Sequence, residues 1–249
     1  MTTVAEVKRW TRPILAEHPD LVLEKRDLYL KPLRHIYRAI EFLGSSQRTF
    51  PTPTARFGVL FAPPSVQMSH SMGLDLPVGY STDPHFQALL ESETRKALDG
   101  TLRRLDTIEA FYELTREDNL IWRVLCTGLS WSPMLQAAVL VALGKFPEAR
   151  QVTTAYIEQA NEPALRAALA SGQALLAKRS RSSDAKYRIS DATTFLKRLS
   201  DVRLLDAGAQ ANDRSGLAAL LRIWEQERVR RLGIEHLWEP TPFPLERSP

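Results

Sequence analysis

The stretch "ALGKFPEARQV", residues 142–152, predicts the turn of a helical hairpin. Gly144 suits the left-handed conformation that closes a helix, and Pro147 is typical of the first position of the next one. Glu148 lies in the same first turn, where the helix dipole favours an acidic residue. The sequence therefore predicts two antiparallel helices over residues 133–143 and 147–159.

More helices are expected on the C-terminal side of this turn. Apolar residues recur at helical spacing in the segments 163–180, 190–205 and 213–233. Gly233 is a typical helix end, and the proline-rich tail that follows, residues 234–249, cannot continue a helix. We expect these helices to form a bundle or a short helical array.

On the N-terminal side the pattern indicates β-structure. Residues 21–31 predict a hairpin, and residues 55–61 predict a buried strand. Residues 35–43 alternate as a strand does, with Arg38 as the one charged residue on the parity that is otherwise apolar. A short amphipathic helix is the competing interpretation of that last segment.

Two stretches of this N-terminal part are expected to be loops. Residues 44–54 have the composition of a loop. Residues 62–84 hold four prolines and four serines and predict a long connection, with room for one short strand near Val66–His70.

The chain turns helical after residue 81. Pro84 predicts a helix start, with Thr82 or Asp83 as its cap, and Gly100 predicts a break. Residues 102–114 predict one amphipathic helix, whereas residues 119–131 could be a buried helix or a strand.

Together these patterns predict an α+β fold. A small β-rich module, residues 1–81, would pack on a mainly helical region, residues 82–249. One continuous core is favoured over two separate domains, because the first module is too small to bury much apolar surface alone.

Composition narrows the class of protein. The 249 residues are 44% hydrophobic and 25% charged with a net charge of +4, which excludes a globally disordered chain and is only mildly basic. The single cysteine, Cys126, cannot form an internal disulfide. The N-terminus lacks the apolar run of a secretory signal, and no apolar run is long enough to span a bilayer. We expect a cytoplasmic protein.

Catalytic and metal-binding motifs are not recognisable. The chain has no glycine-rich phosphate loop, no paired-histidine zinc motif, no GxSxG elbow and no CxxC pair. Cys126 has apolar neighbours and is expected to be buried and inert. The acids Glu24 and Asp27 could form a carboxylate site only if folding brought Asp20 or Glu41 beside them. We therefore expect no cofactor and no metal.

The hairpin around Gly144 resembles a tetratricopeptide repeat. The residues that carry the resemblance are Ala137, Gly144, Phe146 and Ala149. The sequence departs from that pattern at Pro133, at Thr153 and at the late closing proline, Pro163. The resemblance is confined to residues 133–163, has no second copy at the same spacing, and leaves an ordinary αα-hairpin as the alternative.

Two surfaces are candidates for binding a partner. Residues 178–198 hold seven basic and two acidic residues, a net +5, which suits an acidic protein face or phosphates but also a solvated loop. The tail carries two large apolar residues, which either pack on the chain's own helices or are held out for a partner. The candidate partner-binding residues are Lys178, Arg179, Arg181, Lys186, Arg188, Trp238 and Phe243.

These observations predict a non-enzymatic protein-interaction module, such as an adaptor, a chaperone or an inhibitor. One alternative is a nucleic-acid-associated protein that uses the basic segment 178–198. The other is an enzyme whose site residues are dispersed along the sequence.

Overall fold

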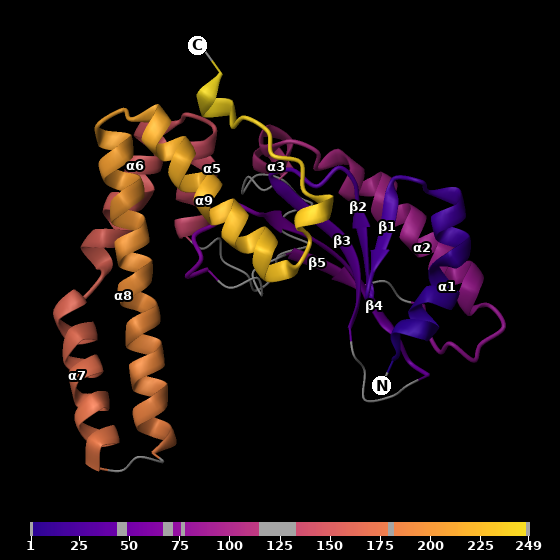
Figure 1. Ribbon diagram of the computed structural model, residues 1–249, viewed down its shortest axis with the longest axis horizontal. Helices are drawn as coiled ribbons and strands as arrows, with labels where there is room; N and C mark the ends of the chain where they lie inside the picture. Colours follow the sequence, from indigo (N-terminus) through magenta and orange to yellow (C-terminus); the bar gives the residue numbers. More distant parts are fainter. Residues whose placement is uncertain are drawn as a thin grey trace. The chain divides into compact units, whose positions relative to one another are not determined.

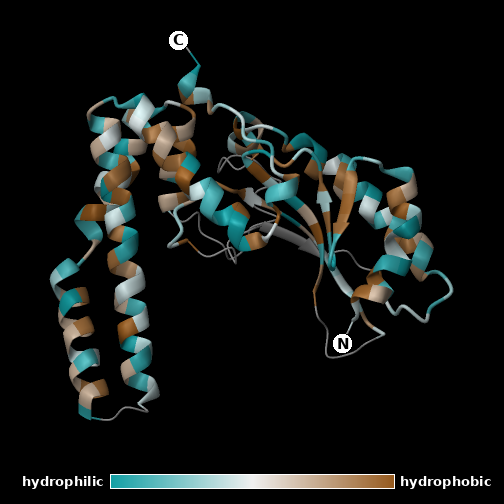
Figure 2. Cartoon of the chain, in the orientation of Figure 1, coloured by the Kyte–Doolittle hydropathy of each residue, from teal (hydrophilic) through white to brown (hydrophobic). Residues whose placement is uncertain are grey.

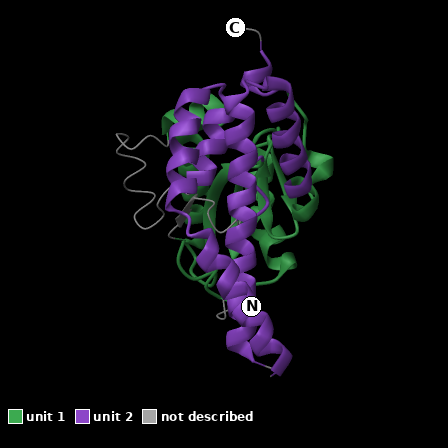
Figure 3. Ribbon diagram, turned by 90° about the vertical axis from the view of Figure 1, so that its left-hand side faces the viewer, with its two compact units in different colours: residues 1–60, 69–130, 229–241 green, residues 61–68, 131–228, 242–249 purple. Residues whose placement is uncertain are grey.

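The computed structural model describes residues 2–43, 49–66, 72–75, 78–114, 133–178 and 182–247 and shows an α+β protein (Figure 1). The chain forms two compact units (Figure 3). Unit 1 comprises residues 1–60, 69–130 and 229–241, and unit 2 comprises residues 61–68, 131–228 and 242–249. This division differs from the boundary at residue 81 that composition suggested.

Unit 1 is built on a five-stranded antiparallel sheet in the order β1-β2-β3-β4-β5. The strands span Leu21–Glu24, Asp27–Leu30, Ile36–Leu43, Thr52–Val59 and Met72–Asp75. The expected hairpin at 21–31 is confirmed, and its two-residue turn is closed by Lys25 at a φ of 57°.

The third predicted strand is also confirmed, so the helical alternative for residues 35–43 is wrong. β4 begins at Thr52, inside the stretch expected to be a loop, because Thr52 and Pro53 pair with Leu43 and Phe42 of β3. The fifth strand, β5, spans Met72–Asp75, and the short strand expected near Val66–His70 falls mostly outside the described residues.

Sequence patterns missed the first helix of unit 1, α1 (Val4–Glu17). Its start is marked by a capping box, in which Glu6 N–H donates to Thr3 Oγ1 and Thr3 N–H donates to the Glu6 carboxylate. Pro13 lies inside the helix. The ring of Trp10 packs against Phe42 of β3 and Phe86 of α2, with centroids 6.5 and 5.2 Å away.

The helices that follow the sheet belong to unit 1, and the first of them packs on α1. α2 spans Phe86–Gly100, so it ends at the predicted break but begins later than Pro84 suggested. The single helix predicted over 102–114 is wrong: a 3₁₀ turn, η2 (Leu102–Arg104), is followed by α3 (Ile108–Leu114). Thr107 restarts the helix, because its Oγ1 accepts a hydrogen bond from Ala110 N–H. Residues 119–131 lie outside the described part of the chain.

Unit 2 is helical. Its helices are α5 (Pro133–Ala142), α6 (Phe146–Gln159), α7 (Glu162–Lys178), α8 (Ser183–Gln210) and α9 (Arg214–Leu232), the last turn of which belongs to unit 1. The predicted hairpin around Gly144 is confirmed. Gly144 has a φ of 72°, its N–H donates to Val141 O, and Lys145 N–H donates to Leu140 O, which is a Schellman motif. Among the described helices, none has the length and hydropathy that crossing a bilayer requires.

Residues 61–66 leave the sheet and pack within unit 2. The Arg228 guanidinium donates to the carbonyls of Ala62, Pro63 and Val66 at 3.0–3.1 Å. Ser65 Oγ donates to Asp201 of α8 at 2.5 Å. These polar contacts fix a proline-containing loop in which one backbone hydrogen bond, from Val66 N–H to Pro63 O at 2.8 Å, closes a turn.

Candidate functional site

The α7–α8 hairpin is the part of unit 2 with the most exposed apolar side chains. α7 packs mainly on α8, and in Figure 1 the tip of the hairpin extends beyond α5 and α6. The two helices approach closely at Gly172, where an added Cβ would lie 2.9 Å from Ile189 Cγ1 and 3.3 Å from Ala185 O. Ser182 caps α8 by accepting from Ala185 N–H.

Burial along this hairpin is low. Gly172 is the only fully buried residue of α7. In α8, Tyr187 is 70% exposed, Leu204 51% and Phe195 38%. Figure 2 shows hydrophobic residues recurring among hydrophilic ones along α7. Apolar groups that remain in water are a common mark of a surface that a partner covers.

An apolar pocket of about 370 Å³ opens at the base of the hairpin, where α6, α7 and α8 meet. Gln159 and Asn161 supply polar groups at the α6–α7 turn, and the apolar walls come from Tyr156, Leu165, Phe195 and Leu199. Burial raises the pKa of the Tyr156 phenol, and the positive charge of Arg198 acts in the opposite direction. The phenol is therefore neutral at physiological pH and can serve as a hydrogen-bond donor in an otherwise apolar wall.

Charged side chains hold the base of the pocket in place. Glu162 accepts hydrogen bonds from Arg166 of its own helix and from Arg203 of α8, both at 2.6 Å. The Arg198 guanidinium lies 5.1 Å from the centroid of the Phe195 ring and donates to Ser65 O at 3.3 Å. These hydrogen bonds hold the side chains around the pocket in fixed positions.

The first part of the basic segment predicted from sequence, residues 178–188, lies at the other end of the same hairpin, whereas Phe195, near the end of the segment, lines the pocket. Lys178 at the end of α7 and Lys186 in the first turns of α8 are exposed, and neither forms an ion pair with another described residue. Arg188 is exposed and pairs with Asp184 at 3.1 Å. Arg179 and Arg181 lie outside the described residues.

The two aromatic residues of the tail lie in different units. Trp238 pairs with Leu33 in a parallel bridge of unit 1, and Glu239 N–H donates to Leu33 O at 2.8 Å. From the sequence we expected Trp238 either on the chain's own helices or held out for a partner. Phe243 is fully buried in unit 2, where its ring packs edge-on against Phe61 at 5.3 Å.

The acids considered for a carboxylate site are partly brought together in unit 1. Asp27 of β2 lies directly opposite Glu41 of β3, and burial together with the Glu41 charge raises the pKa of Asp27 to about 6. Glu41 accepts from Tyr37 Oη and pairs with Arg56 at 2.9 Å. Within the described ranges, no group of three acids, histidines or cysteines could hold a metal ion. Cys126 and His70 lie outside those ranges.

The pocket residues were missed by sequence reasoning because each of them looks like an ordinary helix residue. Tyr156, Leu165 and Phe195 come from three helices, and only tertiary packing brings them to one place. The one available signal was Phe195, a large apolar ring in a segment that carries seven basic residues.

No family model, no curated protein and no solved structure matches this chain.

Proposed function

We propose that this chain is a non-enzymatic protein-interaction module that binds an apolar segment of a partner protein in the pocket between α6, α7 and α8. The observation that carries the proposal is the apolar wall formed by Leu165, Phe195 and Leu199 in a pocket of about 370 Å³. A concave apolar site with a few polar groups at its rim is the usual form of a binding site.

The chemistry of the partner follows from what surrounds the pocket. Its walls suit one or two aliphatic or aromatic anchors, as in recognition of an amphipathic helix by a groove. Lys178 and Lys186 lie at the other end of the same hairpin and lack ion-pair partners in the described residues, so acidic residues farther along the partner segment, about 20 Å from the anchors, would complement them. The single cysteine of the chain is compatible with the reducing conditions of the cytoplasm.

Selection of phage-displayed random peptides against the whole chain tests this proposal. We expect enriched peptides to carry leucine or aromatic anchors, with Asp or Glu farther along the peptide. Phe195→Ala should weaken binding of a selected peptide by roughly tenfold or more, because it removes part of the central anchor wall. Leu204→Ala is the matched control: it shortens an exposed side chain of the same helix that does not line the pocket and should leave affinity unchanged.

The basic residues are tested separately. Lys178→Glu with Lys186→Glu should slow association and reduce its salt dependence, with little effect on the fold. A selection that enriches no peptide family, or peptides that bind Phe195→Ala as tightly as the unaltered chain, would overturn the proposal. Tight nucleic-acid binding that survives Phe195→Ala but not the lysine reversals would instead establish the nucleic-acid alternative.

A further inference from the structure

A second cavity, in unit 1, has a chemistry that the proposed function does not use. It has a volume of about 310 Å³ and lies between the β2–β3 connection and the 3₁₀ turn η2. Four basic side chains line it, against the carboxylates of Asp20 and Asp106. The basic residues are Lys31, Arg34, Arg38 and Arg103.

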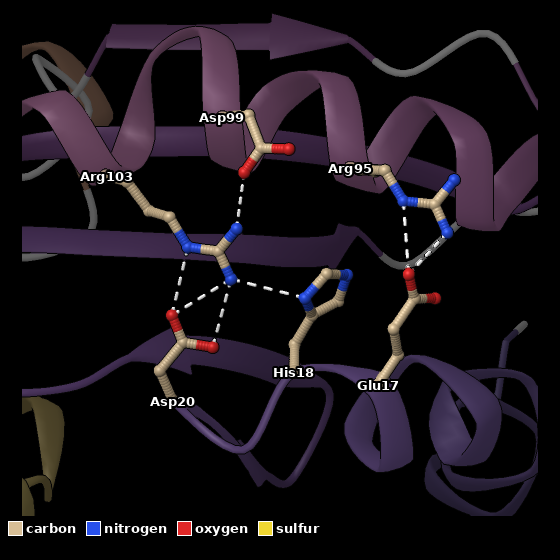
Figure 4. A network of polar contacts seen from close by, with 6 residues as sticks. All are labelled: Glu17, His18, Asp20, Arg95, Asp99 and Arg103. Atoms are coloured by element: carbon tan, nitrogen blue, oxygen red, sulfur yellow. Dashed lines mark hydrogen bonds and ion pairs between the residues drawn. The ribbon is translucent and has the colours of Figure 1, made fainter.

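One wall of the cavity is fixed by a network of ion pairs (Figure 4). The Arg103 guanidinium donates to both Asp20 oxygens at 3.0 and 3.1 Å, contacts His18 Nδ1 at 3.2 Å, and pairs with Asp99. Its charge is therefore compensated within the protein. A neighbouring pair, Arg95 with Glu17, ties α2 to α1 and helps to keep this wall in place.

Arg38, by contrast, is not compensated. Its side chain extends from β3 and the residue is only 5% exposed. Its donors reach two backbone carbonyls, Pro32 O at 2.9 Å and Leu102 O at 3.4 Å, while its buried Nε has no hydrogen-bond partner. No carboxylate in the described residues forms an ion pair with it.

A buried guanidinium without an anion is costly, because the protein interior replaces the water that would stabilise its charge. Burial lowers the pKa of Arg38, and Asp106 is the largest opposing influence. Yet Asp106 is exposed and makes no ion pair with Arg38. Arg38 was also the one charged residue on the apolar parity of its strand, so the sequence puts a cation where a sheet core normally has none.

The entrance to the cavity is also cationic. Lys31 and Arg34 are exposed at its rim, and Arg34 makes one long contact of 3.5 Å with Glu239. Apart from the compensated Arg103–Asp20 pair, the lining carries three positive charges and one negative charge. Guanidinium groups bind carboxylates and phosphates through parallel N–H donors, which a partly satisfied Arg38 still offers.

We propose that this cavity is a binding site for a small oxyanion, a phosphoryl or carboxylate group of a small molecule, with Arg38 at its base and Lys31 and Arg34 at its entrance. The ligand completes the hydrogen bonding of Arg38. Asp106 opposes the ligand and sets the affinity and selectivity of the site.

NMR of the ¹⁵N-labelled full chain tests the proposal at the Arg38 Nε–H group itself. Sodium phosphate and sodium malonate are titrated separately at constant ionic strength, with chloride as the reference anion. We expect a saturable shift of the Arg38 signal, which is identified by its loss in Arg38→Lys. Saturation by phosphate assigns a phosphoryl ligand, and saturation by malonate assigns a carboxylate.

Variants at the exposed rim decide the outcome without disturbing the buried arginine. Lys31→Ala combined with Arg34→Ala should weaken binding of the anion by roughly tenfold, because it removes positive charge at the entrance. Asp106→Asn should strengthen binding by a few fold, because it removes a negative charge there. The matched control is Lys8→Ala with Arg12→Ala, two exposed residues of α1 that do not line the cavity. The proposal is overturned if neither anion gives a saturable shift, or if the rim variants and the control bind alike.

Discussion

Unit 2 contains two consecutive helical hairpins that share a local architecture but differ in burial. In α5, eight of ten residues are buried, so α5 is the interior helix of its hairpin, since α6 has three buried residues. In the 17 residues of α7, only Gly172 is fully buried. The difference follows the polar residues: α5 has a single polar side chain, Gln136, whereas α7 carries five along its length, at Glu162, Arg166, Ser171, Gln173 and Lys178. The first helix of the first hairpin therefore contributes more to the core, whereas that of the second keeps most of its surface exposed.

The largest expected effect tests this difference directly. Leu140→Ala in α5 removes a side chain that is 3% exposed and should cost about 2–5 kcal/mol of unfolding free energy, as cavities in cores do. Leu176→Ala makes the same chemical change at a half-buried position of α7, and it should cost about 1 kcal/mol of unfolding free energy or less. Urea unfolding followed by circular dichroism measures both. Equal losses would mean that α7 is as much a part of the core as α5.

A smaller and more local effect is expected where α7 meets α8. Gly172→Leu places a side chain against Ile189 and the backbone of Ala185, so it should separate the helices at a cost of about 1–3 kcal/mol. Hydrogen exchange followed by mass spectrometry should show lost protection in α7 and in the first half of α8, with α5 and α6 unchanged.

Gln173→Leu is the control for that experiment, because it adds the same side chain at the next position, which is exposed. Protection from hydrogen exchange in α7 and α8 should be retained in this variant. If Gly172→Leu also deprotected α5, the two hairpins would unfold as one cooperative unit, and the contrast between them would concern surface exposure alone.

The two hairpins also differ in how well the sequence predicts them. The first is encoded locally: Gly144 and Pro147 mark its turn within four residues, and each does so for a backbone reason. The helices of the second are equally visible in the sequence, but the pocket at its base is not. The pocket forms only where Tyr156, Leu165 and Phe195 come together, and no local sequence pattern predicts that these residues are neighbours.

In unit 1, too, local sequence patterns predict secondary structure better than they predict tertiary contacts. The alternation in β3 predicted a strand and singled out Arg38, yet the partners of that arginine, Pro32 and Leu102, come from a connection and from a 3₁₀ turn. The helix expected over 102–114 failed for a related reason. Its apolar spacing is also satisfied by a short 3₁₀ turn followed by a capped helix, in which Leu102 and Leu105 are both fully buried.

The smallest expected effect concerns the attachment of the second hairpin, and it depends on pH. Hydrogen bonds from Arg203 and Arg166 hold the pKa of Glu162 below its ordinary value of 4.5. A carboxyl with a lowered folded-state pKa contributes stability that is fully present above its unfolded-state pKa and is lost as pH falls through the lowered one. Glu162→Gln should therefore lower the melting temperature slightly at pH 7, and the difference from the unaltered chain should vanish in acid. Glu158→Gln, an exposed acid of α6, is the control and should show no such convergence. A Glu162→Gln difference that persists at pH 3 would show that the side chain supports α7 by packing rather than by charge, and the base of the pocket would then not depend on its ion pairs.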